Sequence, residues 1–150
     1  MKLAEALSLR KDLQARIEQL KTRLLNNIKV QEGEKPTEDP NDLMGELDGC
    51  LKQLETLIFR INATNMHTVH EGKTITQLNA ERDVLRMRTD FLRSLTNSAS
   101  QLNNRYSRTE IKTVPTMDVK PLRKQIDKLS EQLRLLDLRI QTLNFTTELA

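Results

Sequence analysis

Residues 119–143 read VKPLRKQIDKLSEQLRLLDLRIQTL. Apolar residues recur in this segment at alternating steps of three and four, without a gap: Val119, Leu122, Ile126, Leu129, Leu133, Leu136, Ile140 and Leu143. This period of 3.5 residues places one apolar seam along an α-helix and is typical of a coiled coil. A seam needs a partner helix, so we expect these residues to form a core or an oligomer contact.

The same spacing recurs less perfectly between Leu3 and Leu24, between Leu43 and Ile61, and between Leu78 and Leu102, where Glu81 and Arg88 interrupt it. These patterns predict a mainly α protein with four long amphipathic helices, at about 3–30, 40–65, 75–104 and 118–144. The breaks between them are long enough for sequential helices to run antiparallel. We therefore predict an antiparallel bundle or coiled-coil hairpins, in one domain over residues 1–150.

The segments between the predicted helices also contain patterns that indicate structure. Asp39 before Pro40 and Asp118 before Pro121 are typical of helix starts. The side chains of residues 66–73 alternate between the two faces of a short extended segment that ends in a turn at Gly72. Residues 105–117 are rich in β-branched side chains. We expect two short extended connectors here, which pair as strands with each other or with a second subunit.

Composition narrows the classes of function. Charged residues make up 30% of the chain, aromatic residues 3%, and Trp is absent, which is typical of long helices. The net charge of +3 comes from 24 basic and 21 acidic residues. This near balance does not favour a dedicated nucleic-acid binder, so a nucleic-acid partner is not expected.

The sequence also suggests a location and a state of assembly. Glu5 and Arg10 interrupt the apolar stretch that a signal peptide needs, and no apolar run approaches the length of a membrane span. We expect a cytoplasmic protein without a membrane partner, whose lone Cys50 is a small buried hydrophobe. Leu135 and Leu138 lie outside the seam of the last helix, so homo-oligomerisation is expected, while any other protein partner is unknown.

No catalytic, cofactor or metal motif is found. His67, His70 and Glu71 offer donors that suit zinc, but their spacing does not match the usual helical zinc motif. No cofactor and no metal site are therefore expected, and the chain is not expected to be an enzyme. The charge cluster at Glu81, Arg82, Asp83, Arg86 and Arg88 is interpreted as structural pairing rather than a ligand site.

One connector supports an alternative function. Arg105, Tyr106, Arg108 and Lys112 place three cations around the only Tyr. Basic groups beside an aromatic ring can hold phosphate or stack a base. The preferred hypothesis is a structural or interaction protein that assembles through coiled-coil helices, and the alternative is a nucleic-acid or anion-binding module that uses this connector.

Several linkers and polar clusters resemble one family. The segments are Lys2-Leu-Ala-Glu-Ala-Leu7, Val30-Gln-Glu-Gly-Glu-Lys-Pro-Thr-Glu-Asp-Pro40, Ile61-Asn-Ala-Thr-Asn65, Ala80-Glu-Arg-Asp-Val-Leu85, and Arg105-Tyr-Ser-Arg-Thr-Glu-Ile-Lys112 through Val114-Pro-Thr116. Together they resemble small bacterial coiled-coil proteins known as septicolysin-like, over almost the whole chain. The resemblance implies a helical, intracellular protein of no established biochemical role. It transfers no catalytic residue and no toxin activity.

Overall fold

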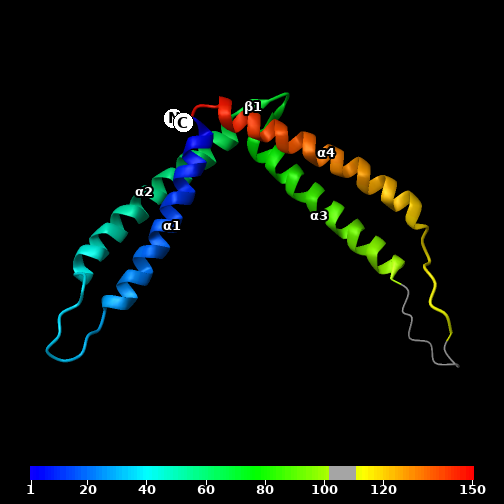
Figure 1. Ribbon diagram of the computed structural model, residues 1–150. Helices are drawn as coiled ribbons and strands as arrows, with labels where there is room; N and C mark the ends of the chain where they lie inside the picture. The colour runs from blue at the N-terminus through cyan, green and yellow to red at the C-terminus, as the bar shows by residue number, and fades with distance from the viewer. Residues whose placement is uncertain (102–110) are drawn as a thin grey trace. The chain divides into compact units, whose positions relative to one another are not determined.

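The computed structural model describes residues 1–101 and 111–150. Most of them lie in four helices, α1 (Leu3–Asn27), α2 (Pro40–His67), α3 (Ile75–Ser100) and α4 (Val119–Thr146) (Figure 1). The strands β1 (Val69–His70) and β2 (Lys73–Thr74) form one antiparallel pair between α2 and α3. The predicted mainly α class with four long helices is confirmed.

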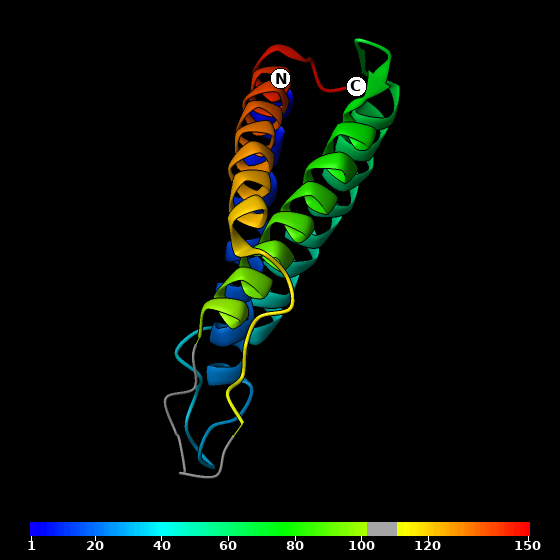
Figure 2. The ribbon, with the colours of Figure 1, turned by 90° about the vertical axis from the view of Figure 1, so that its right-hand side faces the viewer.

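The chain divides into two compact units. The first contains residues 1–75 and 142–150, and the second contains residues 76–141. The helix pair α1 and α2 builds the first unit, together with the β1–β2 pair and the C-terminal segment. The helix pair α3 and α4 builds the second (Figure 2).

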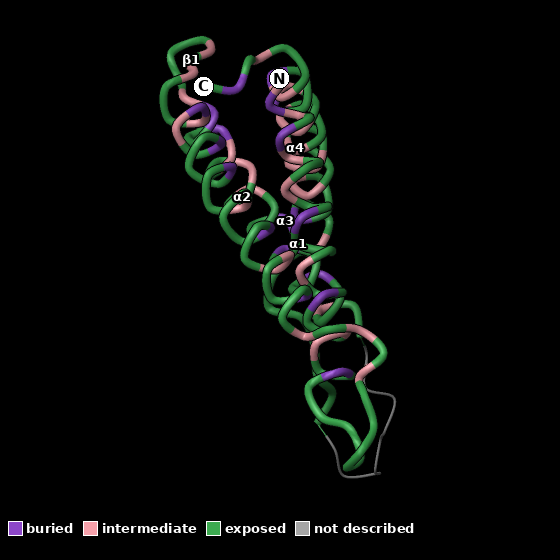
Figure 3. Tube along the Cα trace, turned by 90° about the vertical axis from the view of Figure 1, so that its left-hand side faces the viewer, coloured by how far each residue is buried: buried purple, intermediate pink, exposed green. Residues whose placement is uncertain are grey.

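In the first unit, α1 and α2 approach each other closely. Besides Leu3 and Ile61, their buried residues recur every seven positions, so that one stripe of each helix faces the other: Ala6, Leu13, Leu20 and Asn27 from α1, and Leu43, Cys50, Leu57 and Thr64 from α2. Figure 3 colours the chain by burial. Burial of one such leucine stabilises the folded state by about 1.5–3 kcal/mol. The predicted burial of Cys50 is confirmed.

Helix α1 ends at Asn27, three residues before its predicted end. The Asn27 side chain donates to the carbonyl of Arg23 at 2.8 Å and accepts from the backbone N–H of Glu38 at 3.0 Å. It thereby joins the last turn of α1 to the connector before α2. The predicted start of α2 is confirmed, because the Asp39 carboxylate accepts from the N–H of Asn41 at 2.9 Å and Pro40 is the first helical residue.

The first connector contains a strand pair of its own, whereas residues 102–110 of the second connector lie outside the described residues and pairing with a second subunit stays a prediction. Val69 pairs with Thr74 and His70 with Lys73, so both strands lie inside the first connector. Glu71 and Gly72 form the turn with φ of 49° and 79°, as a two-residue hairpin of type I′ requires. Residues 111–118 form no strand.

The seam of α3 also differs from its prediction. The inward-facing positions are Ile75, Leu78, Arg82, Leu85, Thr89, Leu92, Thr96 and Ala99, a perfect alternation of three and four that contains three polar residues. Thr89 and Thr96 are buried, and their hydroxyls donate to the carbonyls of Leu85 at 2.8 Å and Leu92 at 2.6 Å. Threonine can occupy this seam because its hydroxyl finds an acceptor one turn back in the same helix.

Gly45 and Gly49 of α2 provide a test of helix stability. A Cβ added at either position would meet no atom within 4 Å, so neither glycine is required for a close approach of another helix. We expect Gly45→Ala and Gly49→Ala each to raise the free energy of unfolding by about 0.5–1 kcal/mol, because alanine loses less backbone entropy in a helix. Urea titration measures the change. Gly72→Ala is the control and should destabilise, since its φ is positive.

Candidate interaction surface

The seam of α4 is only partly covered within the chain. Leu122, Ile140 and Leu143 are buried, whereas five of the predicted seam residues are half-buried: Val119, Ile126, Leu129, Leu133 and Leu136. The backbones of α3 and α4 also approach each other less closely than those of α1 and α2. Apolar surface therefore stays open between α3 and α4.

One face of the α3–α4 pair is held by ionic and polar contacts. Asp137 of α4 forms ion pairs with Arg82, at 3.9 Å between Nε and Oδ1, and with Arg86, at 3.7 Å between Nη2 and Oδ2. Arg93 donates to the Ser130 hydroxyl at 3.0 Å on the same face. The predicted structural pairing of the charge cluster is thus confirmed for Arg82 and Arg86, and Glu81 also takes part in an interaction within the chain.

The other face of this pair carries an apolar groove of about 570 Å³. Its walls come from α3 and α4, and its lining residues are Ala80, Glu81, Val84, Leu85, Arg88, Leu129, Gln132 and Leu136. The exposed fraction is 64% for Val84 and also 64% for Phe91, which lies two turns further along the same side of α3. We call this surface, the groove with Phe91 and Leu95 beside it, the α3–α4 apolar face.

The α1–α2 pair of the first unit also has ion pairs on one side and exposed apolar residues on another. Arg16 pairs with Glu46, and Arg23 pairs with Glu38, where its Nε donates to Oε2 at 3.0 Å. The hydrogen bond from Arg23 lowers the pKa of the Glu38 carboxyl. Away from these ion pairs, α2 exposes a stripe at seven-residue spacing, formed by Met44, Leu51 and Ile58. Each helix pair therefore has an ion-paired side and an open apolar side.

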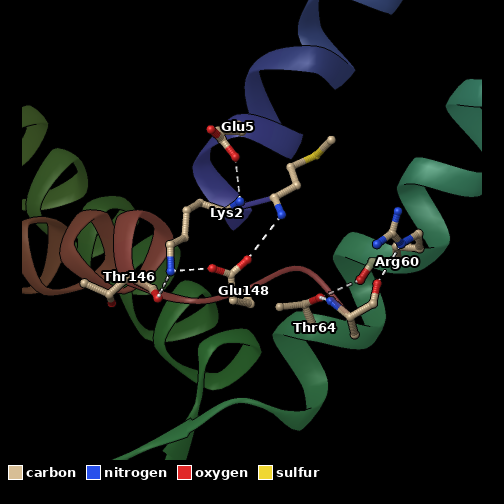
Figure 4. A network of polar contacts seen from close by, with 8 residues as sticks. Lys2, Glu5, Arg60, Thr64, Thr146 and Glu148 are labelled. Atoms are coloured by element: carbon tan, nitrogen blue, oxygen red, sulfur yellow. Dashed lines mark hydrogen bonds and ion pairs between the residues drawn. The ribbon is translucent and has the colours of Figure 1, made fainter.

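The two ends of the described chain meet in the first unit (Figure 4). Lys2 and Glu148 form an antiparallel bridge, flanked by hydrogen bonds from the Leu3 N–H to the Thr147 carbonyl at 2.9 Å and from the Leu149 N–H to the Met1 carbonyl at 2.8 Å. The Glu148 carboxylate accepts from Lys2 Nζ at 2.6 Å and from the α-amino group at 3.2 Å. We call this arrangement the terminal clasp.

The terminal clasp continues onto α2. The Ala150 N–H donates to the Thr64 hydroxyl at 2.9 Å, and Arg60 Nε donates to the Ala150 carbonyl at 2.6 Å. Thr64 in turn donates to the Arg60 carbonyl at 2.8 Å. The sequence does not indicate this cluster, because the contacts that the C-terminal residues make with the N-terminus and α2 join positions 86 to 147 residues apart.

The clasp predicts a titration of Glu148. Hydrogen bonds from Lys2 and the α-amino group lower the pKa of this carboxyl below its ordinary value of 4.5. A carboxyl with a lowered pKa stabilises the fold above pH 4.5, and this contribution is lost as the pH falls through the lowered pKa. We expect an NMR titration of the Glu148 carboxyl carbon to show a midpoint below 4.5. Lys2→Gln should move the midpoint upward, and a wild-type midpoint at or above 4.5 would contradict the clasp.

The predicted anion-binding connector lies mostly outside the part of the chain that the structure describes. Arg105, Tyr106 and Arg108 lie outside the described residues, and Lys112 is exposed in irregular backbone. His67 ends α2, with Nδ1 2.8 Å from the Ala63 carbonyl, whereas His70 lies in β1. Within residues 1–101 and 111–150 there is no cluster of three potential metal ligands, and no helix is long and apolar enough to cross a membrane.

Comparison with known proteins identifies the family. Residues 10–149 match the model of DUF6847, a family of unknown function. The chain belongs to this family. A crystal structure described as that of a functionally unknown conserved protein from Corynebacterium diphtheriae is similar to this DUF6847 protein at 40% sequence identity. The similarity covers 100% of this chain and 99% of that chain, with a TM-score of 0.92.

No curated protein matches this DUF6847 chain. The matches do not bear on the resemblance to septicolysin-like proteins, which stays a prediction. The exposed surface of the chain is therefore the evidence that bears on its function.

Proposed function

We propose that this protein is a structural or interaction protein that assembles with copies of itself through the α3–α4 apolar face. The observation that carries the proposal is the groove between α3 and α4, where half-buried seam leucines adjoin the exposed Val84 and Phe91. Single exposed apolar residues are ordinary on protein surfaces, whereas contiguous exposed patches mark interaction sites.

The chemistry of the groove supports a helical protein partner. Leucines at coiled-coil spacing form holes that accept apolar side chains from another helix. The rim carries Glu81 and Arg88, so charges of both signs border the apolar lining. Nucleic acid would favour a purely basic rim, and an interfacial membrane helix would favour a polar face rich in Lys and Arg.

A second copy of the chain is the simplest partner, because self-association requires no other protein. Identical copies bring the same apolar face, and self-association lets two open faces cover each other. The proposal includes a cytoplasmic location.

The test is light scattering after size-exclusion chromatography, over loading concentrations that span about two orders of magnitude. We expect the wild-type mass to rise from one chain toward a defined oligomer as the concentration increases. The ratio of absorbance at the nucleic-acid and protein maxima of the eluted peak should show protein alone. A mass of one chain at every concentration would overturn the proposal, and nucleic acid that co-elutes with the chain would favour the alternative module.

A further inference from the structure

Two opposite charges border the groove at matched positions on α3. Glu81 and Arg88 are both groove-lining residues, and their spacing of seven residues places them on the same side of the helix, two turns apart. Val84 and Leu85 lie midway between them and line the same groove. The order along this side of α3 is therefore negative, apolar, positive.

When two copies of this side of α3 run in opposite directions, the negative end of each copy lies opposite the positive end of the other. We propose that a second copy of the chain docks antiparallel along α3, related by a two-fold axis that passes beside Val84 and Leu85. Glu81 then faces the partner's Arg88, and Arg88 faces the partner's Glu81. The inference rests on the proposed self-assembly and adds its register and symmetry.

The same charges disfavour the parallel alternative. In a parallel pair in register, Glu81 would lie beside the partner's Glu81 and Arg88 beside the partner's Arg88, and facing like charges destabilise an interface. The antiparallel arrangement replaces both repulsions with attractions. It also produces an isologous contact, in which the same patch is used by both subunits and the assembly closes as a dimer.

Arg88 has the freedom to form such a pair. It is exposed, and within residues 1–101 and 111–150 no hydrogen bond or ion pair engages its guanidinium. Glu81 already takes part in an interaction within its own chain. A carboxylate has two oxygens and can accept from a further donor, so this interaction does not prevent contact with the partner.

A charge exchange tests the register. Glu81→Arg and Arg88→Glu are prepared as single variants and as the double variant, and the dimer dissociation constant of each is measured by sedimentation velocity. Each single variant places two like-charged pairs across the two-fold axis, so we expect its dimer to be at least about tenfold weaker than the wild-type dimer. The double variant restores both pairs with reversed polarity and should recover to within about threefold.

Mixing provides a second readout that a loss of folding cannot imitate. An equimolar mixture of the two single variants should form a heterodimer, because each of its two charge pairs is then attractive. Asp90→Arg is the matched control: it makes the same charge change as Glu81→Arg on an exposed residue of α3 that does not line the groove, and it should leave dimerisation unchanged.

The outcomes separate this inference from the proposed function. If the wild type dimerises but neither single variant is weaker, or the double variant and the mixture do not recover, the register is wrong while self-assembly stands. If the wild-type chain is monomeric at all concentrations, both the register and the proposed function are overturned.

Discussion

The Phe91→Glu variant should lose self-association while it retains its helices. Phe91 lies beside the groove with 64% of its surface exposed within one chain, so its replacement removes little intrachain packing. In a two-fold dimer the substitution occurs twice, and truncation of an aromatic residue that is covered in an interface can cost about 2 kcal/mol. We therefore expect the dissociation constant to rise by about a thousandfold, while the far-ultraviolet circular dichroism stays unchanged.

Phe59→Glu is the matched control for this variant. Phe59 lies on α2 with 73% of its surface exposed, and it belongs to the other unit. The same substitution there removes the same ring and adds the same charge at a residue that does not belong to the α3–α4 apolar face. If Phe59→Glu and Phe91→Glu weaken association equally, the interface lies elsewhere.

The Leu20→Ala variant should show a large loss of stability in the first unit. Leu20 is fully buried on the α1 side of the α1–α2 seam. Removal of a buried leucine side chain loses its transfer free energy and leaves a cavity, at a cost of about 2–5 kcal/mol. Urea unfolding followed by circular dichroism should show the transition of this unit at lower denaturant concentration.

Leu25→Ala makes the same chemical change on the same helix. Leu25 has 65% of its surface exposed, so its replacement should change the free energy of unfolding by no more than about 0.5 kcal/mol. Equal losses for Leu20→Ala and Leu25→Ala would contradict the observed orientation of α1.

The regular parts of the fold could be predicted from sequence because local rules decide them. The uninterrupted apolar spacing of α4 and the Asp39-Pro40 start of α2 each indicate structure within a few residues. The seam of α3 could not be predicted from apolar spacing. Its inward positions include Arg82, Thr89 and Thr96, and an apolar pattern does not reveal that Asp137 pairs with Arg82 or that the threonine hydroxyls bond to their own helix.

The contacts that sequence reasoning missed are those between distant residues. The terminal clasp joins Lys2 to Glu148, and no local pattern in the sequence connects these two residues. The sequence predicts open apolar surface at Leu135 and Leu138 of α4, and both residues are exposed. The position of the α3–α4 apolar face could not be predicted, because it depends on which side of the helix pair is covered. The β1–β2 pairing depended on Glu71 in a left-handed conformation, which a non-glycine residue adopts infrequently.

The most direct test of self-association through the α3–α4 apolar face is a distance measurement between two chains. Met87→Cys, on the exposed side of α3, is spin-labelled in a Cys50→Ala background and studied by pulsed dipolar spectroscopy. We predict a defined dipolar coupling between labels that vanishes when the labelled chain is diluted with excess unlabelled chain. Absence of coupling at Met87, at concentrations where light scattering shows an oligomer, would contradict this account.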